Sequence, residues 1–397
     1  MSRFSNASED VRPLIQLDPE GGSRQMMRYL DSGDGSASPG SPMSPLGSAG
    51  SPSGWSSRQH QCHERTWGKW LLEEVMAASS ILSLVFTCFI YNAVFLMVIL
   101  PEVGKKHWVQ PLAVVFNVTW VLTMWSYLQA HLQSPGAAPK EWREFVEQVG
   151  DALAVAQPRR EWQPGQASFC RPCMTLRPER AHHCSICNLC VLRFDHHCPF
   201  VKNCIGFRNH KFFILLLVYG MLLAWIGLFS TFPEMIRFLA AFMNLHRGLP
   251  WPEAGVSKTS AGLFLMFDCI AVMFAMLFPP LVLVHLPLAA NNQTTIENQY
   301  LNMPNPYNLG STLANLTQLF GSPGWDWVLP IHPLHPVDDG VSFQRGDLDF
   351  GEAMRLSALD SPQDVEQLWQ IRYQVSMSNL AKKFRQRSLN PCIGCLQ

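Results

Sequence analysis

The sequence has few charged residues for its length. Only 15% of its 397 residues are charged and 48% are hydrophobic, whereas charged residues make up ~25% of a typical soluble domain. The 30 basic and 30 acidic side chains cancel, so the net charge gives no reason to expect a nucleic-acid partner. No apolar stretch follows the first residue, and we therefore expect no signal peptide. The shortage of charge instead indicates segments that cross a membrane.

Four apolar stretches are long enough to cross the ~30 Å hydrocarbon core of a membrane as helices. They cover residues 75–100, 109–130, 212–232 and 261–284. Only the fourth contains a charged residue, Asp268, which we expect near an interface with water. The pattern predicts an all-α polytopic membrane protein with both termini on one side. Residues 73–131 would form a helical hairpin, and residues 212–290 would carry the third and fourth helices around a lumenal loop, 233–260.

Two features indicate which side the termini occupy. Most Lys and Arg residues lie in the termini and between the second and third stretches, and few lie in the loops 101–108 and 233–260. Basic segments stay on the cytosolic side of membrane proteins, and unpaired thiols persist in the reducing cytosol. We therefore expect both termini and the cysteine-rich segment between the second and third stretches to be cytosolic. We expect an endomembrane, Golgi or ER, rather than the plasma membrane.

The two tails and the linker differ in composition. Residues 1–72 include a run over 31–57 that is rich in Ser, Gly and Pro and should be disordered. The four Ser-Pro pairs in this run are either phosphorylation sites or part of a flexible tail without that function. The linker 132–164 spaces Trp142, Phe145 and Val149 as in an amphipathic helix, which lies on the membrane or packs on the next segment. The tail 326–397 ends in basic residues, Cys392 and Cys395, which suit anionic lipid and S-acylation.

The cysteine-rich segment, residues 165–211, has the spacing of a double zinc site. It contains seven of the 12 cysteines, including two C-x-x-C pairs whose sulfurs can reach one metal ion. Two tetrahedral sites need eight ligands, so six cysteines and two histidines would fill both. Zinc should supply most of the stability, because the segment has few apolar residues. One cysteine is then left over, and its position alone does not identify it.

Cys198 is the candidate for the spare thiol, because its neighbours suit a nucleophile. His196 can accept the thiol proton while Asp195 orients the imidazole and stabilises its cationic form. A cysteine beside a protonated histidine also has a lowered pKa. In an extended strand, His196 and Cys198 would face one side and His197 would face the metal.

The run Asp195-His196-His197-Cys198 stands in the frame C-x2-C-x9-H-C-x2-C-x2-C-x4-D-H-H-C-x5-C. This frame resembles the DHHC protein S-acyltransferases, or palmitoyltransferases. The resemblance extends to the four spans and, within the juxtamembrane segment 291–325, to a T-T-x-E-like run at 294–297 and an N-P-Y run at 305–307. It covers about residues 70–321 and leaves out both tails.

The resemblance implies transfer of a palmitoyl or similar long-chain acyl group from acyl-CoA to cytosolic cysteines of membrane-associated proteins. Cys198 would carry the acyl group, with His196 as base and Asp195 orienting it, and the four spans would enclose the acyl chain. Two structural zinc ions are implied. One would be held by Cys170, Cys173, His183 and Cys190, and the other by Cys184, Cys187, His197 and Cys204.

Coenzyme A carries phosphates, which need cationic partners. Arg177, Arg180 and His182 lie in the matching part of the family pattern and are the candidates, although each is equally readable as a solvated surface charge. Thr295 and Asn315 would be structural supports rather than catalysts.

The sequence departs from the family pattern at Phe200, where Trp is usual, and at Lys202, where Asn is usual. It also has one extra residue between Gly310 and Asn315. These departures leave open a second function, a zinc-bearing membrane adaptor that keeps the fold and recruits partners without acyltransferase activity. A zinc hydrolase would need an open metal position and an H-E-x-x-H-like run, which the sequence lacks.

Overall fold

The computed structural model describes residues 67–252, 255–348, 365–373 and 375, all within one compact unit of the chain. The predicted N-terminal tail lies almost wholly outside the described residues. So do the four Ser-Pro pairs, Cys392 and Cys395.

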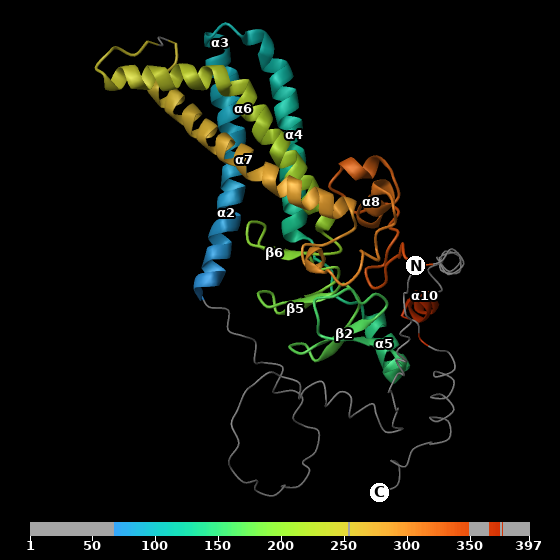
Figure 1. Ribbon diagram of the computed structural model, residues 1–397. Helices are drawn as coiled ribbons and strands as arrows, with labels where there is room; N and C mark the ends of the chain where they lie inside the picture. Colours follow the sequence, from blue (N-terminus) through green and yellow to red (C-terminus); the bar gives the residue numbers. More distant parts are fainter. Residues whose placement is uncertain (1–66, 253–254, 349–364, 374, 376–397) are drawn as a thin grey trace, which may run out of the picture. The chain divides into compact units, whose positions relative to one another are not determined.

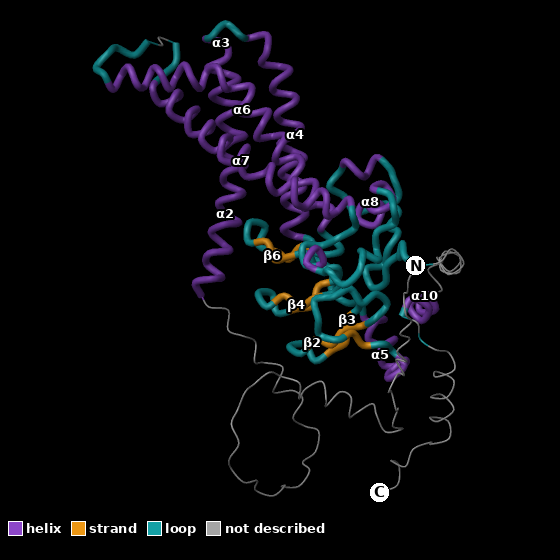
Figure 2. The backbone as a smooth tube through the Cα atoms, viewed as in Figure 1, coloured by secondary structure: helices purple, strands orange, loops and turns teal. Residues whose placement is uncertain are grey.

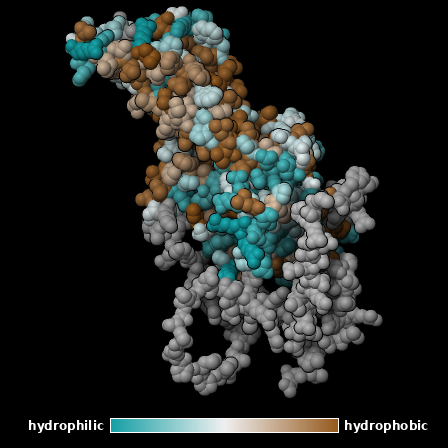
Figure 3. Space-filling view, in the orientation of Figure 1, coloured by the Kyte–Doolittle hydropathy of each residue, from teal (hydrophilic) through white to brown (hydrophobic). Residues whose placement is uncertain are grey.

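Four long apolar helical segments dominate the described chain (Figure 1). The first consists of α2 (Trp67–Ile90), the π-helix η1 (Tyr91–Ile99) and α3 (Leu100–Glu102). A short 3₁₀-helix, η2 (Lys106–Trp108), leads into the second, α4 (Val109–Leu132). The third and fourth are α6 (His210–His246) and α7 (Lys258–Ala290). All four are long and apolar enough to cross a membrane, and apolar side chains cover this part of the surface in Figure 3.

The helices run past the ends of the predicted spans. The largest difference is in α6, which continues to His246, so that much of the loop predicted over 233–260 is helical. Pro233 lies inside α6. Proline removes a backbone hydrogen bond and bends a helix without ending it, and α6 changes direction in its second half (Figures 1 and 2). Hydropathy detects only the apolar part of such a helix, which explains the difference in length.

The four helical segments pack through aromatic rings and a few paired polar groups. The rings of Tyr91 and Phe116 stack with their centroids 3.7 Å apart. Asn92 and Asn117 exchange two amide hydrogen bonds, of 3.0 and 2.8 Å. Asp268 is buried and accepts a hydrogen bond of 2.6 Å from Thr231 on α6. Asn92, Asn117 and Asp268 therefore each have a hydrogen-bond partner on another helical segment, as is usual for polar groups kept from water.

The cysteine-rich segment is built from short strands, so the all-α prediction is wrong for this part of the chain. Strands β1 (Val155–Ala156), β2 (Ala167–Cys170) and β3 (Thr175–Arg177) form one sheet. The hairpins β4–β5 (His182–Cys184 and Leu189–Val191) and β6–β7 (His196–Cys198 and Asn203–Ile205) form two more (Figure 2). Each C-x-x-C pair, Cys170–Cys173 and Cys184–Cys187, lies at the tight turn between two antiparallel strands, which lets both of its sulfurs face one point.

The linker helix α5 (Lys140–Val149) packs on protein. Its buried Trp142 and Phe145 contact Trp369 and Tyr373, which belong to or follow α10 (Val365–Arg372). The Trp142 indole also donates to the Leu176 carbonyl on β3 at 3.0 Å. Of the two alternatives for the linker helix, packing against the cysteine-rich segment is therefore the one observed. A short 3₁₀-helix, η3 (Gly150–Ala152), follows α5.

After α7 the chain returns to the cysteine-rich segment. It forms the 3₁₀-helix η4 (Glu297–Gln299), the helix α8 (Thr312–Phe320) and the 3₁₀-helix η5 (Trp325–Val328). Asn315 is buried, accepts from the Leu309 amide at 2.8 Å and donates to the Ala290 carbonyl at 2.9 Å. It thus holds α8 to the end of α7, as a structural support would, despite the extra residue before it.

Gly206 lies where the β6–β7 hairpin meets α6, and we expect Gly206→Ala to destabilise the fold. A Cβ there would collide with Val191 and lie 2.8 Å from the Pro135 carbonyl oxygen. Overpacking of this kind costs about 1–3 kcal/mol. The midpoint of thermal unfolding in detergent should fall by several degrees. Gly262→Ala is the matched control, because nothing lies within 4 Å of its Cβ position; an equal fall in both variants would contradict the prediction.

Candidate metal and active site

The cysteine-rich segment brings eight ligand residues into two groups. The first group is Cys170, Cys173, His183 and Cys190, and the second is Cys184, Cys187, His197 and Cys204. Within each group the ligand atoms lie within 4.8 Å of one another. The membership of both groups is the one that the family resemblance implies.

The ligand spacing suits zinc. Four ligands at 2.0–2.3 Å from a tetrahedral ion are about 3.3–3.8 Å apart. Cys173 Sγ lies 3.3 Å from His183 Nδ1 and 3.6 Å from Cys190 Sγ. In the second group, Cys187 Sγ lies 3.4 Å from both His197 Nδ1 and Cys204 Sγ. The donor set and its spacing therefore fit two closed, structural zinc sites, which would stabilise the fold without exposing a position for catalysis.

The two groups are joined through short hairpins. Residues His183 and Cys190 face each other across β4–β5, and His197 and Cys204 face each other across β6–β7. The residues that follow the two C-x-x-C turns, Met174 and Asn188, both have a φ of 53°, in the left-handed region. This backbone reversal lets each pair of sulfurs point back to one place.

Cys198 belongs to neither group. Strand β6 places His197 toward the second ligand group, while His196 and Cys198 point to the opposite side. Cys198 is 8% exposed and borders an apolar cavity between the helices. The spare thiol predicted by the ligand count is thus separate from the metal groups.

Asp195 and His196 form a closely bonded pair next to this thiol. Asp195 Oδ2 lies 2.6 Å from His196 Nδ1. The other carboxylate oxygen accepts from the Thr295 amide at 2.8 Å, and the Thr295 hydroxyl donates to the Asp195 carbonyl at 2.6 Å. Thr295 therefore holds Asp195 in place from a segment 100 residues further along the chain.

The pair changes the acidity of the neighbouring groups. Burial lowers the pKa of His196, but hydrogen bonding to Asp195 and Cys198 and the negative charges of these two groups raise it to about 9. Burial raises the pKa of Cys198, but hydrogen bonding to His196, the charge of that imidazole and the backbone amides of Val201 and Phe200 together lower it by more, so the pKa lies below its ordinary value. The arrangement favours a thiolate beside an imidazolium, which is the activated form of a cysteine nucleophile.

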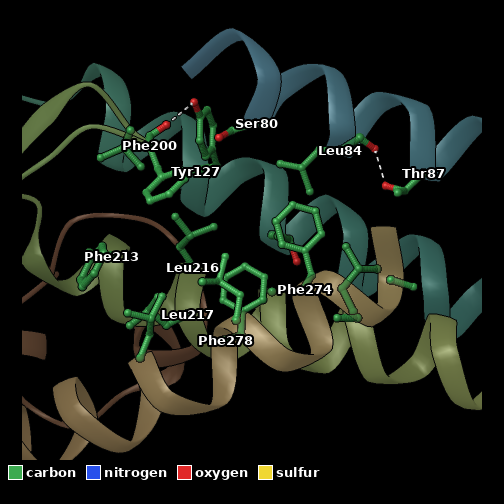
Figure 4. A pocket seen from close by; sticks show the side chains of 18 of the residues that line it. Ser80, Leu84, Thr87, Tyr127, Phe200, Phe213, Leu216, Leu217, Phe274 and Phe278 are labelled. Carbon is green, nitrogen blue, oxygen red and sulfur yellow. Dashed lines mark hydrogen bonds between the residues drawn. The ribbon is translucent and has the colours of Figure 1, made fainter. Parts of the chain in front are cut away.

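The cavity beside Cys198 is almost entirely apolar. It has an empty volume of about 930 Å³, including space open to its surroundings. In Figure 4, Tyr127 and Phe200 lie at one end, with Phe274 and Thr87 further along. The Tyr127 hydroxyl donates to the Phe200 carbonyl at 3.0 Å. Phe200, which replaces the usual Trp, thus still borders the cavity.

Sequence reasoning missed His285, near the end of α7. It is 8% exposed, its Nδ1 lies 3.7 Å from Asp195 Oδ2, and its ring lies 5.4 Å from that of His196. Asp195, His196 and His285 form a third group of ligand-type atoms within 4.8 Å of one another. The sequence does carry a signal, since His285 directly follows the apolar stretch 261–284.

The three candidates for binding CoA lie in different settings. Arg180 is buried: its guanidinium donates to both carboxylate oxygens of Glu297, at 2.7 and 2.8 Å, and to the Asn292 carbonyl at 2.8 Å. Arg177 is half-buried and donates to the Ser168 hydroxyl at 2.7 Å. Burial and the charge of Arg177 lower the pKa of His182 to about 4, so its imidazole is neutral at pH 7.

Comparison with known proteins identifies the family to which this site is similar. Residues 163–301 match the family described as DHHC palmitoyltransferase. The chain is 30% identical over 232 residues to "Probable protein S-acyltransferase 12" of Arabidopsis thaliana, covering 58% of this chain and 76% of the relative. It is 31% identical over 278 residues to "Palmitoyltransferase ZDHHC20-B" of Danio rerio, covering 64% of this chain and 78% of the relative.

The two ligand groups predict the metal content of the purified protein. We expect two zinc ions per chain in the wild type and one in Cys173→Ser, because that thiolate belongs to the first group alone. Cys198→Ser should keep both ions. Elemental analysis of protein purified without added metal tests this, and a loss of zinc from Cys198→Ser equal to that from Cys173→Ser would count against the assignment of ligands.

Proposed function

Because the chain belongs to the DHHC palmitoyltransferase family, we propose that it is a protein S-acyltransferase that transfers palmitoyl from acyl-CoA to cysteines of membrane-associated proteins. One observation carries the proposal: the thiol of Cys198 lies between the Asp195–His196 pair and an apolar cavity enclosed by four membrane-type helices. The base therefore lies on one side of the thiol, and space for an acyl chain lies on the other side.

In the first step, His196 takes the thiol proton of Cys198, and the thiolate attacks the carbonyl carbon of the acyl-CoA thioester. The carbon–sulfur bond to CoA breaks, and the imidazolium returns the proton to the leaving CoA thiolate. In the second step, His196 takes the proton of the substrate cysteine, whose thiolate attacks the acyl-Cys198 thioester. Cys198 leaves and regains a proton. Two easier reactions thereby replace one difficult one.

Asp195 serves both steps by orienting His196 and stabilising its cationic form. The backbone N–H groups of Phe200 and Val201 also contribute, since hydrogen bonds from them lower the pKa of Cys198. The eight cysteine and histidine ligands would hold two zinc ions, and those ions would supply structural stability alone.

The cavity supports a long acyl chain as substrate. Each methylene removed from water contributes ~0.8 kcal/mol, so a chain of palmitoyl length strongly prefers an apolar cavity to solvent. The proposal places both termini and the zinc domain in the cytosol, where acyl-CoA is available, on an endomembrane such as the Golgi or ER. Substrates would be membrane-associated proteins with cytosolic cysteines close to the bilayer.

Arg177 is the most suitable of the three candidates for the CoA phosphates. It is half-buried, and within the described part of the chain it donates one side-chain hydrogen bond, to Ser168, which leaves other donors of its guanidinium for a phosphate. Arg180, buried against Glu297, and His182, neutral at pH 7, would support the domain around it.

Labelled palmitoyl-CoA tests the nucleophile. We expect wild-type protein to form an adduct that hydroxylamine removes and that maps to the peptide containing Cys198. Cys198→Ala should lose this adduct while keeping two zinc ions, and Cys269→Ala, which removes an exposed thiol on α7, should keep it. An adduct retained by Cys198→Ala at that peptide would contradict the mechanism. A wild type with full zinc and no adduct would favour the adaptor function.

The cavity predicts which residue limits the length of the acyl chain. Ala271 lines the cavity, and α7 rises ~21 Å between Ala271 and His285 beside the catalytic pair. Ala271→Phe should shorten the space and shift auto-acylation from sixteen- toward fourteen-carbon acyl-CoA, measured as the ratio of initial rates. The neighbouring Val272 is 37% exposed outside the cavity, so Val272→Phe should leave the ratio unchanged. Equal ratios of the two initial rates in both variants would refute this placement of the acyl chain in the cavity.

A further inference from the structure

The first turns of α2 carry two consecutive acidic residues, Glu73 and Glu74, and both reach the β6–β7 hairpin. Glu73 Oε1 lies 3.6 Å from His197 Nε2. Glu74 contacts Lys202, whose Nζ also lies 5.7 Å from the centre of the Trp70 ring. One stretch of the first membrane-type helix thus meets the hairpin that carries Cys198.

The two contacts differ in burial. The side chains of Glu73 and His197 are 9% and 7% exposed, whereas those of Glu74 and Lys202 are 38% and 26% exposed. An ion pair open to water contributes little, typically below ~1 kcal/mol. A carboxylate kept from water is retained only at a cost, which a specific partner must offset. The Glu73 contact is therefore the one that calls for a function.

His197 is a partner of Glu73 that itself needs an acceptor. Its Nδ1 faces the sulfurs of Cys184, Cys187 and Cys204, at 3.4 to 3.9 Å. Its Nε2 is buried and has no hydrogen-bond partner among the described residues. An imidazole that binds a metal ion through one nitrogen keeps a proton on the other, and that N–H needs an acceptor. Glu73 is the acidic group that faces it.

We propose that Glu73 is a positioning residue for the second zinc site: with the ion bound, its carboxylate, 3.6 Å from His197 Nε2 in this structure, closes on that nitrogen, accepts its N–H and fixes the orientation of the ligand. The inference rests on the zinc assignment within the proposed function, but not on acyl transfer. A carboxylate behind a ligating histidine typically strengthens metal binding 10- to 100-fold. Here the carboxylate comes from a membrane-type helix, so the metal site is tied to that helix.

This link reaches the nucleophile through the chain itself. His197 and Cys198 are neighbours in β6, so the orientation of the histidine determines where the thiol points. The same helix, α2, contributes Ser80, Leu84 and Thr87 to the cavity wall. Glu73 therefore holds the thiol and the cavity in a fixed relation, since both depend on the position of α2.

The test measures zinc release to a chromogenic chelator from the full chain in detergent, with Cys198→Ala as the background so that no acylation takes part. We expect the background protein, which carries Cys198→Ala alone, to release its two ions slowly. Glu73→Leu should release one of the two at least ten times faster, because the His197 N–H loses its acceptor. Glu73→Gln, whose amide oxygen can still accept the His197 N–H, should release zinc at a rate between that of the background protein and that of Glu73→Leu.

Glu74→Gln is the matched control, one residue away and in an exposed pair. It should release zinc at the background rate. In chains with Cys198 intact, Glu73→Leu should also lower the rate of auto-acylation more than Glu74→Gln does. If Glu73→Leu folds and both ions leave at the background rate, the proposal is wrong. If Glu73→Leu does not fold, the comparison of Glu73→Gln with Glu74→Gln decides, and equal release rates in those two would overturn it.

Discussion

The alternation of side chains along β6 is the constraint on which the site depends. In three residues the strand presents His196 and Cys198 to one side and His197 to the other. The second ligand group holds His197, and hydrogen bonding to Asp195 holds His196. Because the period of a strand is two residues, fixing the proposed metal ligand His197 also fixes the direction of the proposed nucleophile Cys198. If the strand shifted by one residue, His197 would turn away from the metal group and Cys198 would turn toward it. Both metal binding and nucleophilic attack would then be lost.

Buried charges keep the segment after α7 against the cysteine-rich domain. The Arg180–Glu297 pair is almost fully buried, and Arg180 and Arg193 both donate to the Asn292 side chain. Burial raises the pKa of Glu297, but the charge and hydrogen bonds of Arg180, the Thr294 amide and the charge of Arg193 together lower it by more, so the carboxylate stays ionised. Such pairs gain little net stability but are costly to break. They therefore specify where Thr295 lies, and through Thr295 they specify the position of Asp195.

The C-terminal helix α10 belongs to the same polar and aromatic structure. Tyr373 accepts a hydrogen bond from the Glu179 amide at 3.0 Å and donates to the Val341 carbonyl at 2.7 Å. Its ring packs on Trp142 of α5. A segment far along the chain thus completes the core beside the zinc domain, although it lies outside the part of the sequence that resembles the family.

The sequence by itself determined those features of the protein that depend on residues close together in the chain. Hydropathy predicted four helices, ligand spacing predicted two metal groups with one cysteine left over, and Asp195 and His196 made Cys198 the candidate for it, because these patterns depend on neighbouring residues. Only the tertiary structure decided what depends on distant residues: the hydrogen bonds from Thr295 to Asp195, the position of His285 and the contact of Glu73 with His197. It also decided that Arg180 is buried in an ion pair and that the ligand pairs sit on strands. Spacing along the chain carries no information about which buried charge faces which.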